Sequence, residues 1–295
     1  MKVFITGASG WVGRHVVPEL LKHGHTITAI ARSEASAIAL EKQGVTVVRG
    51  DLENTDLLQS SAKASDAVIH LAYIHDFSDY GGKPAQIDFA AIKAMCSGLE
   101  ETNKPFIGTS GLLGLPLPQD ETVSAPGGPR KQGEEVAFSF NDKGVKSIVI
   151  RLSPSVHGTG DHGFVPFLID LAKKNGYSGY IKDTKTRWTG VHVKDAAVLY
   201  RLAIENKNQN LKGGEILHAT SEKGVSIIEI SKLIGENLNL ESKELVEKKD
   251  INDYFGWMSH ILSMDCNATS EITREKTGWE PKEVGLLEDI KTNYF

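Results

Sequence analysis

The stretch that decides the fold is Lys2-Val3-Phe4-Ile5-Thr6-Gly7-Ala8-Ser9-Gly10-Trp11-Val12-Gly13. A buried-strand run breaks here into glycines spaced by three, and a helical pattern follows. Gly7 allows a sharp turn off the strand, Gly10 lets a pyrophosphate approach the backbone, and Gly13 lets the helix pack close to the sheet. The helix N-terminus adds N–H groups and the positive end of the helix dipole. A dinucleotide site is predicted, with a glycine-rich turn that binds no ligand as the alternative. The residues of this stretch that are predicted to contact the dinucleotide are Gly7, Ser9, Gly10, Trp11, Val12 and Gly13.

Short runs rich in valine and isoleucine alternate with amphipathic segments through the first half of the chain. This order is typical of repeated βαβ units, and therefore of a parallel sheet covered by helices. The predicted strands are residues 3–6, 26–31, 46–49, 67–71, 106–109 and 147–152. The predicted helices are residues 12–22, 35–42, 56–63, 85–101 and 131–141. The fold class predicted is α/β, with a Rossmann-type, doubly wound parallel sheet.

The pattern loosens after Leu152. Residues 153–163 are rich in Gly, Ser, Pro and His, which predicts a loop at the end of a strand, where loops often carry function. Later elements are expected as a helix at 164–175, a short strand at 190–193, a helix opened by Asp195, a strand at 215–219 and a helix from Ser226. We expect residues 1–155 to form a dinucleotide-binding, Rossmann-type domain whose sheet is completed by segments around 190–220. Residues 156–295 are expected to be mixed segments that include a smaller C-terminal substrate-binding lobe.

Composition argues against several classes of function. The formal net charge is −5 and no basic cluster offsets it, so nucleic-acid binding is not expected. No apolar run is long enough to span a bilayer, and the N-terminus leads into a strand without a visible signal peptide. Two cysteines are too few for a disulfide framework, so a cytoplasmic setting is expected. The expected partner is a small-molecule substrate, and the expected state is a monomer or a homodimer.

Other common sites have no sequence signature here. The histidines do not form a His-Glu-x-x-His pattern and Cys96 and Cys266 lie far apart, so no metal site is predicted. The glycine stretch lacks the Gly-Lys-Ser/Thr ending of an ATP-binding loop, and no Gly-x-Ser-x-Gly elbow of a hydrolase is present.

The end of the second strand indicates which dinucleotide binds. In this fold an acidic residue there accepts a hydrogen bond from the ribose of NAD, whereas an arginine accommodates the 2′-phosphate of NADP. Here Arg32 and Ser33 follow the strand, and both side chains can donate to phosphate oxygens. NADP(H) is therefore predicted, with NAD(H) less favoured; the alternative for Arg32 is an exposed residue without a ligand. Further cofactor contacts are expected from Asp51 and Leu52 at the adenine, and from Leu71 and Ala72 along the groove.

Together these residues resemble the extended short-chain dehydrogenase/reductase superfamily, also called the NAD-dependent epimerase/dehydratase family. The matching motifs are Thr6-Gly7-x-x-Gly10-x-x-Gly13, Gly50-Asp51-Leu52, His70-Leu71-Ala72, Thr109-Ser110-Gly111, Arg151, Ser155-Val156-His157-Gly158 and Val191-His192-Val193-x-Asp195-Ala196-Ala197. The resemblance covers nearly the whole chain. The tracts from His70 to Phe77 and from Arg151 to Pro166 resemble an atypical branch of fungal and bacterial oxidoreductases. The resemblance also implies cofactor contacts from Pro154, Ser155, Val156 and His157.

The chemistry usual in this family needs Tyr-x-x-x-Lys on the helix after the fifth strand, and the pair is absent here. No tyrosine of the chain has a lysine four residues later. Counting back from Arg151 puts Arg130 at the lysine position, with Glu134 one helical turn further on. A second register puts Arg130 at the tyrosine position and Glu134 at the lysine position. In the first, preferred register Arg130 can donate to the ribose hydroxyls, but it cannot supply a proton near neutral pH. The alternative is an Arg130–Glu134 pair on the helix surface without a role in chemistry.

Hydride transfer to a carbonyl needs a donor at the developing oxyanion. The resemblance implies such a contact from Thr109 or Ser110 at the end of the fifth strand; closing a tight turn is their alternative role. Histidines have a suitable pKa, and His75 and His162 are the leading proton donors. Weaker candidates for proton transfer are Tyr73 and His157. Arg187, Trp188 and His192 could face the substrate lobe, although core packing is favoured for Trp188.

Three functions remain open at this point. The first is an NADP(H)-dependent oxidoreductase that acts on a small carbonyl or alcohol with a non-standard proton donor. The second is a non-catalytic NADP(H)-binding redox sensor or partner-binding module, which the missing Tyr and Lys keep open. The third and weakest is a sugar-nucleotide-type epimerase or dehydratase, because those enzymes also rely on the missing tyrosine.

Overall fold

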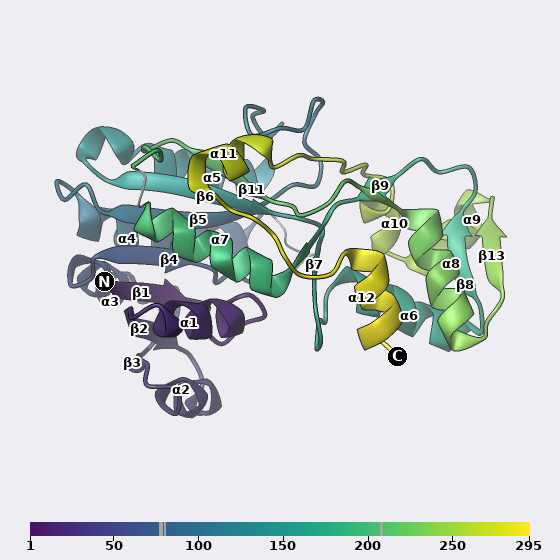
Figure 1. The fold of residues 1–295 in the computed structure, drawn as a ribbon, viewed down its shortest axis with the longest axis horizontal. Helices are drawn as coiled ribbons and strands as arrows, with labels where there is room; N and C mark the ends of the chain where they lie inside the picture. The colour runs from purple at the N-terminus through teal and green to yellow at the C-terminus, as the bar shows by residue number, and fades with distance from the viewer. Residues whose placement is uncertain (77–78, 80, 207–208) are drawn as a thin grey trace.

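The computed structural model describes residues 1–76, 79, 81–206 and 209–295, and its centre is a seven-stranded parallel sheet (Figure 1). Phe77, which ends one of the tracts quoted above, lies outside the described residues. The strand order is β11-β6-β5-β4-β1-β2-β3, so the direction of winding reverses between β1 and β4. The strands are β1 Lys2–Thr6, β2 Thr26–Ala31, β3 Thr46–Arg49, β4 Ala67–His70, β5 Pro105–Gly111, β6 Lys146–Leu152 and β11 Ile216–Ala219. The predicted Rossmann-type fold is confirmed.

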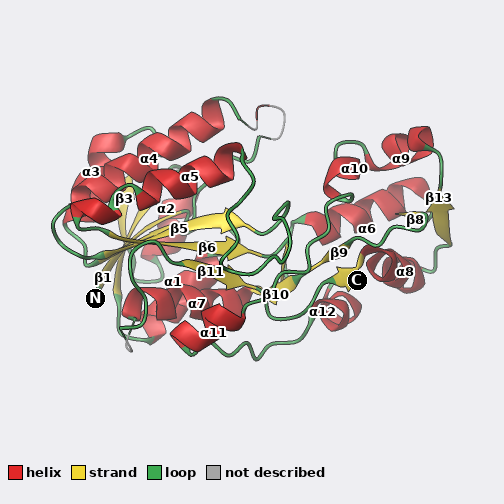
Figure 2. Cartoon of the chain, turned by 90° about the horizontal axis from the view of Figure 1, so that it is seen from above, coloured by secondary structure: helices red, strands yellow, loops and turns green. Residues whose placement is uncertain are grey.

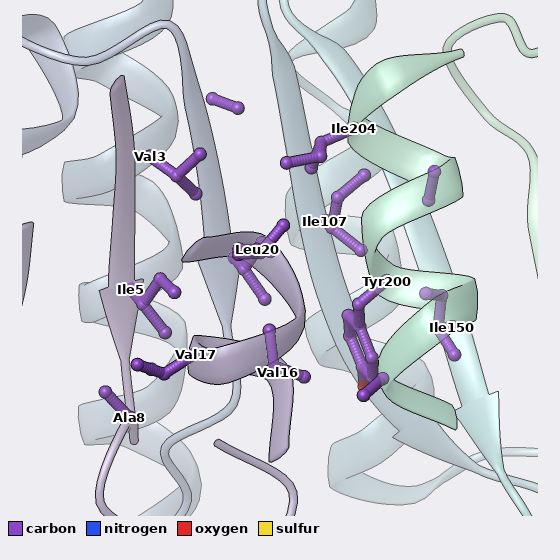
Figure 3. Packing of buried hydrophobic residues seen from close by; sticks show 14 of the residues in the cluster. Val3, Ile5, Ala8, Val16, Val17, Leu20, Ile107, Ile150, Tyr200 and Ile204 are labelled. Carbon is purple, nitrogen blue, oxygen red and sulfur yellow. The ribbon is translucent and has the colours of Figure 1, made fainter. Parts of the chain in front are cut away.

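Alternation along each strand divides the core into two layers, because successive side chains point to opposite faces of the sheet. In β1, Val3 and Ile5 face one layer and Phe4 faces the other. Figure 3 shows the first layer, where α1 packs on β1 and Tyr200 and Ile204 of α7 pack beside β5 and β6. The helices of this layer are α1 Gly13–Lys22, α2 Glu34–Glu41 and α7 Val193–Glu205. Those of the second layer are α3 Thr55–Lys63, α4 Lys83–Leu99 and α5 Gly128–Phe138.

A second hydrophobic cluster lies beyond the carboxyl ends of the central strands (Figure 2). Trp188 is fully buried in it, which confirms core packing for this side chain. Its helices are α6 Phe164–Asn175, α8 Ile227–Leu238, α9 Lys248–Phe255, α10 Met258–Ile261 and α12 Leu286–Asn293. Its strands are β8 Ser178–Ile181, β9 Arg187–Trp188, β12 Val225–Ser226 and β13 Ser242–Leu245. Two further helical segments with described bounds are α11 Glu271–Thr277 and a 3₁₀ turn, Asn141–Lys143.

The second half of the chain differs from the prediction in three places. The segment 153–163 is not all loop, because β7 Ser155–His157 pairs in parallel with β10 Gly190–His192. Since β10 pairs there, β11 is the one described strand from the region 190–220 that completes the central sheet. The helix expected from Asp195 begins at Val193 instead, after His192 accepts a hydrogen bond from the backbone of Lys194.

Candidate functional site

The glycine turn is packed so tightly that two of its positions exclude a side chain. Gly7 has a φ of +73°, and a Cβ there would lie 2.6 Å from the backbone nitrogen of Ala72. A Cβ on Gly13 would lie 2.1 Å from the carbonyl oxygen of Gly7. On Gly10 it would meet, among the described residues, only that same carbonyl oxygen, at 3.2 Å. The turn therefore holds Ala72 against β1 and leaves the side of Gly10 open to a ligand.

The start of α1 is joined to the segment that follows β6. No described side chain caps Val12 at the start of this helix, and its first turn contains no acidic residue. The indole of Trp11 donates to the carbonyl oxygen of Val156 at 2.6 Å, and the ring of His162 lies 5.9 Å from the indole. Ser9 and Gly10 are exposed beside this contact. The predicted residues Trp11, Val156 and His162 are thus brought together.

The residues expected at the adenosine end lie at one edge of the sheet. Arg32 is exposed directly after β2, and the carbonyl of Ala31 before it accepts a hydrogen bond from Gly50, which precedes Asp51. Ser33 caps α2, since its hydroxyl accepts from the Ser36 amide at 3.2 Å and donates to the Ser36 hydroxyl at 2.9 Å. The Ser33 hydroxyl is therefore engaged in the helix cap, and Arg32 is the exposed cation that directly follows β2.

Side-chain hydrogen bonds of Asp51 and His70 order the segments that follow β3 and β4. The Asp51 carboxylate accepts from the Glu53 amide, and Leu52 is buried beside it. His70 lies 2.6 Å from the Thr6 hydroxyl and 3.0 Å from the Asp88 carboxylate. The Thr6 hydroxyl also accepts from the amide of Ala72 at 3.3 Å, so the half-buried Leu71–Ala72 segment is held at the glycine turn.

Asp88 was not identified from the sequence as a residue near the site. It lies on the buried face of α4, beside Ala85, Ala91 and Ile92. An acidic residue on the apolar face of an expected helix was the available signal, because a buried carboxylate needs a partner. Here that partner is His70.

The two hydroxyls at the end of β5 have different surroundings. Thr109 donates to the carbonyl oxygen of His70 at 2.7 Å, so the contact at 2.8 Å from the phenol of Tyr200 is donated by that phenol. Burial raises the pKa of Tyr200, which therefore stays protonated as the donor. The proton of Thr109 is thus already used, and the structure does not fit the expected role for this residue as donor to a substrate. The hydroxyl of Ser110 is buried and has no hydrogen-bond partner among the described residues.

Arg130 lies against an aromatic ring that follows β4. Its guanidinium carbon is 3.7 Å from the centre of the Tyr73 ring, a cation–π contact. The ring of His75 meets Tyr73 edge-on, at 5.3 Å between centroids. Partial desolvation and the Arg130 charge lower the pKa of His75, and the nearby His162 adds to this. The Tyr73 cluster, meaning Tyr73, His75 and Arg130, therefore presents a neutral imidazole next to a permanent cation at neutral pH.

The prediction that Arg130 and Glu134 pair on the helix surface is wrong. Glu134 is buried and forms a two-pronged ion pair with Arg151, with contacts of 2.8 and 2.7 Å. A further nitrogen of Arg151 donates to the carbonyl oxygen of Val123 at 2.7 Å. Glu134 therefore fixes α5 to β6, while Arg130 on the same helix is left to contact the Tyr73 cluster.

A small void lies between Arg130 of α5 and the end of β5. Its volume is about 10 Å³, enough for about one water molecule. Arg130, Thr109 and Asp88 are among the residues that line it.

No group of three or more His, Cys, Asp or Glu side chains suited to a metal ion gathers within the part of the chain that the structure describes. None of the described helices combines the length and apolarity needed to cross a membrane.

The side chain of His157 contacts α12. It lies 2.8 Å from Asp289 of α12, and both side chains are fully buried. Burial alone would raise the pKa of Asp289, but hydrogen bonds from His157 and Asn293 hold it below its usual range. One ring nitrogen of His157 is therefore engaged by α12, and the cofactor contact that the resemblance implied stays a prediction. Of its neighbours, Pro154 is half-buried and the hydroxyl of Ser155 is buried without a described partner.

Comparison with known proteins places the chain in a family. The model of the NAD dependent epimerase/dehydratase family matches residues 3–219. An uncharacterized protein of Saccharomyces cerevisiae is 39% identical over 306 residues, which cover 100% of this chain and 99% of the yeast protein. The 4-hydroxy-2-methyl-3-oxo-4-farnesyl-3,4-dihydroquinoline-1-oxide ketoreductase of Stigmatella aurantiaca is 23% identical over 82% of this chain and 75% of its own. The crystal structure of a dTDP-glucose 4,6-dehydratase from Streptomyces venezuelae with NAD bound has a TM-score of 0.77 at 15% identity, over 99% of this chain and 95% of the other. The chain therefore belongs to the NAD-dependent epimerase/dehydratase family.

Proposed function

We propose that this protein is an NADP(H)-dependent oxidoreductase that acts on a carbonyl or alcohol and uses a proton donor other than the usual tyrosine of the family. The Tyr73 cluster carries this proposal, because it puts a titratable imidazole and a fixed cation after β4, at the point where the sheet reverses direction. Ligands of such sheets bind at that point, outside the carboxyl ends of the strands. The likeness to a ketoreductase supports the reaction class.

The residues present fit a dinucleotide phosphate. The open side of Gly10 and the uncapped start of α1 would receive the pyrophosphate. Arg32 would bind the 2′-phosphate, since it is exposed at the end of β2 and no acidic residue stands there. The nicotinamide, when bound, supplies or accepts the hydride.

Three side chains would act on the substrate oxygen and its proton. Ser110, whose hydroxyl has no described partner, would donate a hydrogen bond to the substrate oxygen. His75 would take the proton during alcohol oxidation, because its lowered pKa keeps the imidazole neutral. Arg130 would stabilise negative charge on that oxygen, since its guanidinium carries a positive charge.

Turnover with a panel of carbonyl compounds tests the reaction class. Purified protein is incubated with NADPH and a series of aldehydes and ketones, and coenzyme oxidation is followed by absorbance. The proposal predicts oxidation that depends on both protein and carbonyl. Measurable NADPH binding without turnover on any carbonyl would contradict catalysis and favour a coenzyme-binding sensor.

Replacing Arg32 by aspartate should reverse the preference between coenzymes. We expect NADPH to bind about 10- to 100-fold more weakly, because charge-assisted hydrogen bonds to the 2′-phosphate are lost. NADH should bind at least as tightly as before, since the new carboxylate can accept from the ribose. Calorimetric titration of both coenzymes gives the two dissociation constants.

The control for this variant is Lys42→Asp, which makes the same charge change at the exposed C-terminal cap of α2. It should leave the ratio of the two dissociation constants within about twofold, because screening weakens charges that do not touch the ligand. An unchanged ratio in Arg32→Asp would refute the role of Arg32.

A further inference from the structure

Three aromatic side chains form a partly exposed surface next to the candidate site. Phe164 and Phe167 lie in the first turn of α6, and Trp257 lies just before α10. The centroid of the Trp257 ring is 5.2 Å from that of Phe167 and 6.3 Å from that of Phe164. Phe164 also packs at 5.4 Å on the fully buried Trp188. The aromatic wall, meaning Phe164, Phe167 and Trp257, is therefore fixed from behind.

Part of the wall is accessible from solvent. Trp257 is 45% exposed, and the two phenylalanines are only partly buried. Exposed single apolar residues are common, but a contiguous aromatic group is more often a binding surface. Binding of an apolar ligand against these rings would be favourable, because it removes apolar surface from water.

Two segments connect the wall with the candidate site. α6 begins directly after Gly163, next to His162, which lies against Trp11 and close enough to His75 to lower its pKa. On the other side Leu113 follows the end of β5, three residues after Ser110, and packs against the same hydrophobic cluster as Phe164 and Phe167. Figure 2 shows the central strands directed towards the part of the molecule that holds α6 and α10.

The charges nearby do not favour a nucleoside diphosphate as substrate. Arg187, directly before Trp188, is held by Asp265 at 2.7 and 3.1 Å, and the Asp265 carboxylate also accepts from the Arg187 amide. A diphosphate would have to displace this carboxylate in order to use the guanidinium. An uncharged substrate meets no such competition.

We propose that the substrate carries an extended apolar body, alkyl or aryl, which binds against the aromatic wall while its carbonyl or alcohol lies at Ser110 and the Tyr73 cluster. This inference rests on the proposed function and names its substrate class. Phe164, Phe167 and Trp257 are then specificity-determining residues that contact the substrate away from the reacting atoms.

Unbranched aldehydes from butanal to decanal test the proposal, because the reacting group is constant while the apolar body grows. With NADPH present, kcat/KM should rise with each added carbon, by up to about fourfold per buried methylene. In Trp257→Ala the rise should flatten. The expected loss of kcat/KM is at least about tenfold for decanal, mainly through KM, and less than about twofold for butanal.

The matched control is Val284→Ala, which truncates an equally exposed apolar residue outside the wall. It should keep the dependence on chain length. Turnover that does not depend on chain length, or a preference for UDP-glucose over decanal, would overturn the aromatic wall while leaving the proposed reaction class standing.

A binding measurement separates this inference from the proposed function. Calorimetric titration with 1-decanol and with 1-butanol, in the presence of NADPH, which cannot accept a hydride from an alcohol, reports affinity without turnover. Tighter binding of 1-decanol that is lost in Trp257→Ala supports the wall even if no aldehyde is reduced. Equal affinity of Trp257→Ala and the unaltered protein for 1-decanol overturns it.

Discussion

Replacing Glu134 by alanine should lower the free energy of unfolding by about 3–5 kcal/mol. The reason is that Arg151 is 0% exposed and receives its counter-charge from Glu134 through two hydrogen bonds. Without that carboxylate, a buried guanidinium keeps only the carbonyl oxygen of Val123 as a described partner. Equilibrium unfolding in urea, followed by circular dichroism, gives the change.

The adjacent residue provides the control for this prediction. Glu135 is exposed and pairs with Lys131 on the helix surface at 3.4 Å. Glu135→Ala should therefore cost no more than about 0.5 kcal/mol. If both variants lost the same small amount of stability, the buried ion pair would not be what fixes α5 to β6.

Replacing His75 by alanine should lower kcat by about 10²- to 10⁴-fold, which is the range for loss of a general acid or base. KM should change little, because the imidazole is proposed to act in proton transfer and not in substrate binding. Initial rates of NADPH oxidation with the best aldehyde of the panel give both constants. His23→Ala removes an exposed histidine at the end of α1 and should leave both unchanged. A full loss in Tyr73→Phe with none in His75→Ala would contradict the assignment to His75.

The pH dependence of alcohol oxidation gives a second readout for the same residue. Partial desolvation and the Arg130 charge lower the pKa of His75 below 6.5, so the imidazole is the neutral base at pH 7. The rate should therefore hold as the pH falls towards 6.5 and decline only below the lowered pKa. In His75→Ala this decline at low pH, the acid limb of the profile, should disappear. An unchanged acid limb in His75→Ala would assign the titration to another group.

The central sheet could be predicted because its information is local. Valine and isoleucine runs, glycine turns and helical periodicity lie within each βα unit, and all six strands predicted in the first half of the chain are present. β7 was missed because a three-residue strand in a segment rich in Gly, Ser and Pro has no periodicity of its own. It forms through its pairing with β10, which no local pattern shows.

The candidate site could be predicted in part, for a related reason. Strand ends indicated Arg32 and His75, whereas Ser110 and Arg130 came from the family resemblance. The structure brings Arg130 and His75 to the same ring, Tyr73, and the roles of these residues stay predictions. The contact partners of these side chains could not be assigned from their spacing in the sequence. Glu134 lies four residues from Arg130, as a helix-surface pair would, yet the face of α5 that meets β6 gives it to Arg151. The contact of Arg130 with Tyr73 joins α5 to the segment after β4, so it too depends on tertiary packing.

Calorimetric titration of the unaltered protein with NADPH and with NADH tests the central claim most directly. That claim is that the glycine turn and Arg32 together bind a dinucleotide phosphate. We expect both coenzymes to bind at one site per chain, with the smaller dissociation constant for NADPH. Absence of heat and of a thermal shift with both coenzymes, or tighter binding of NADH, would contradict it.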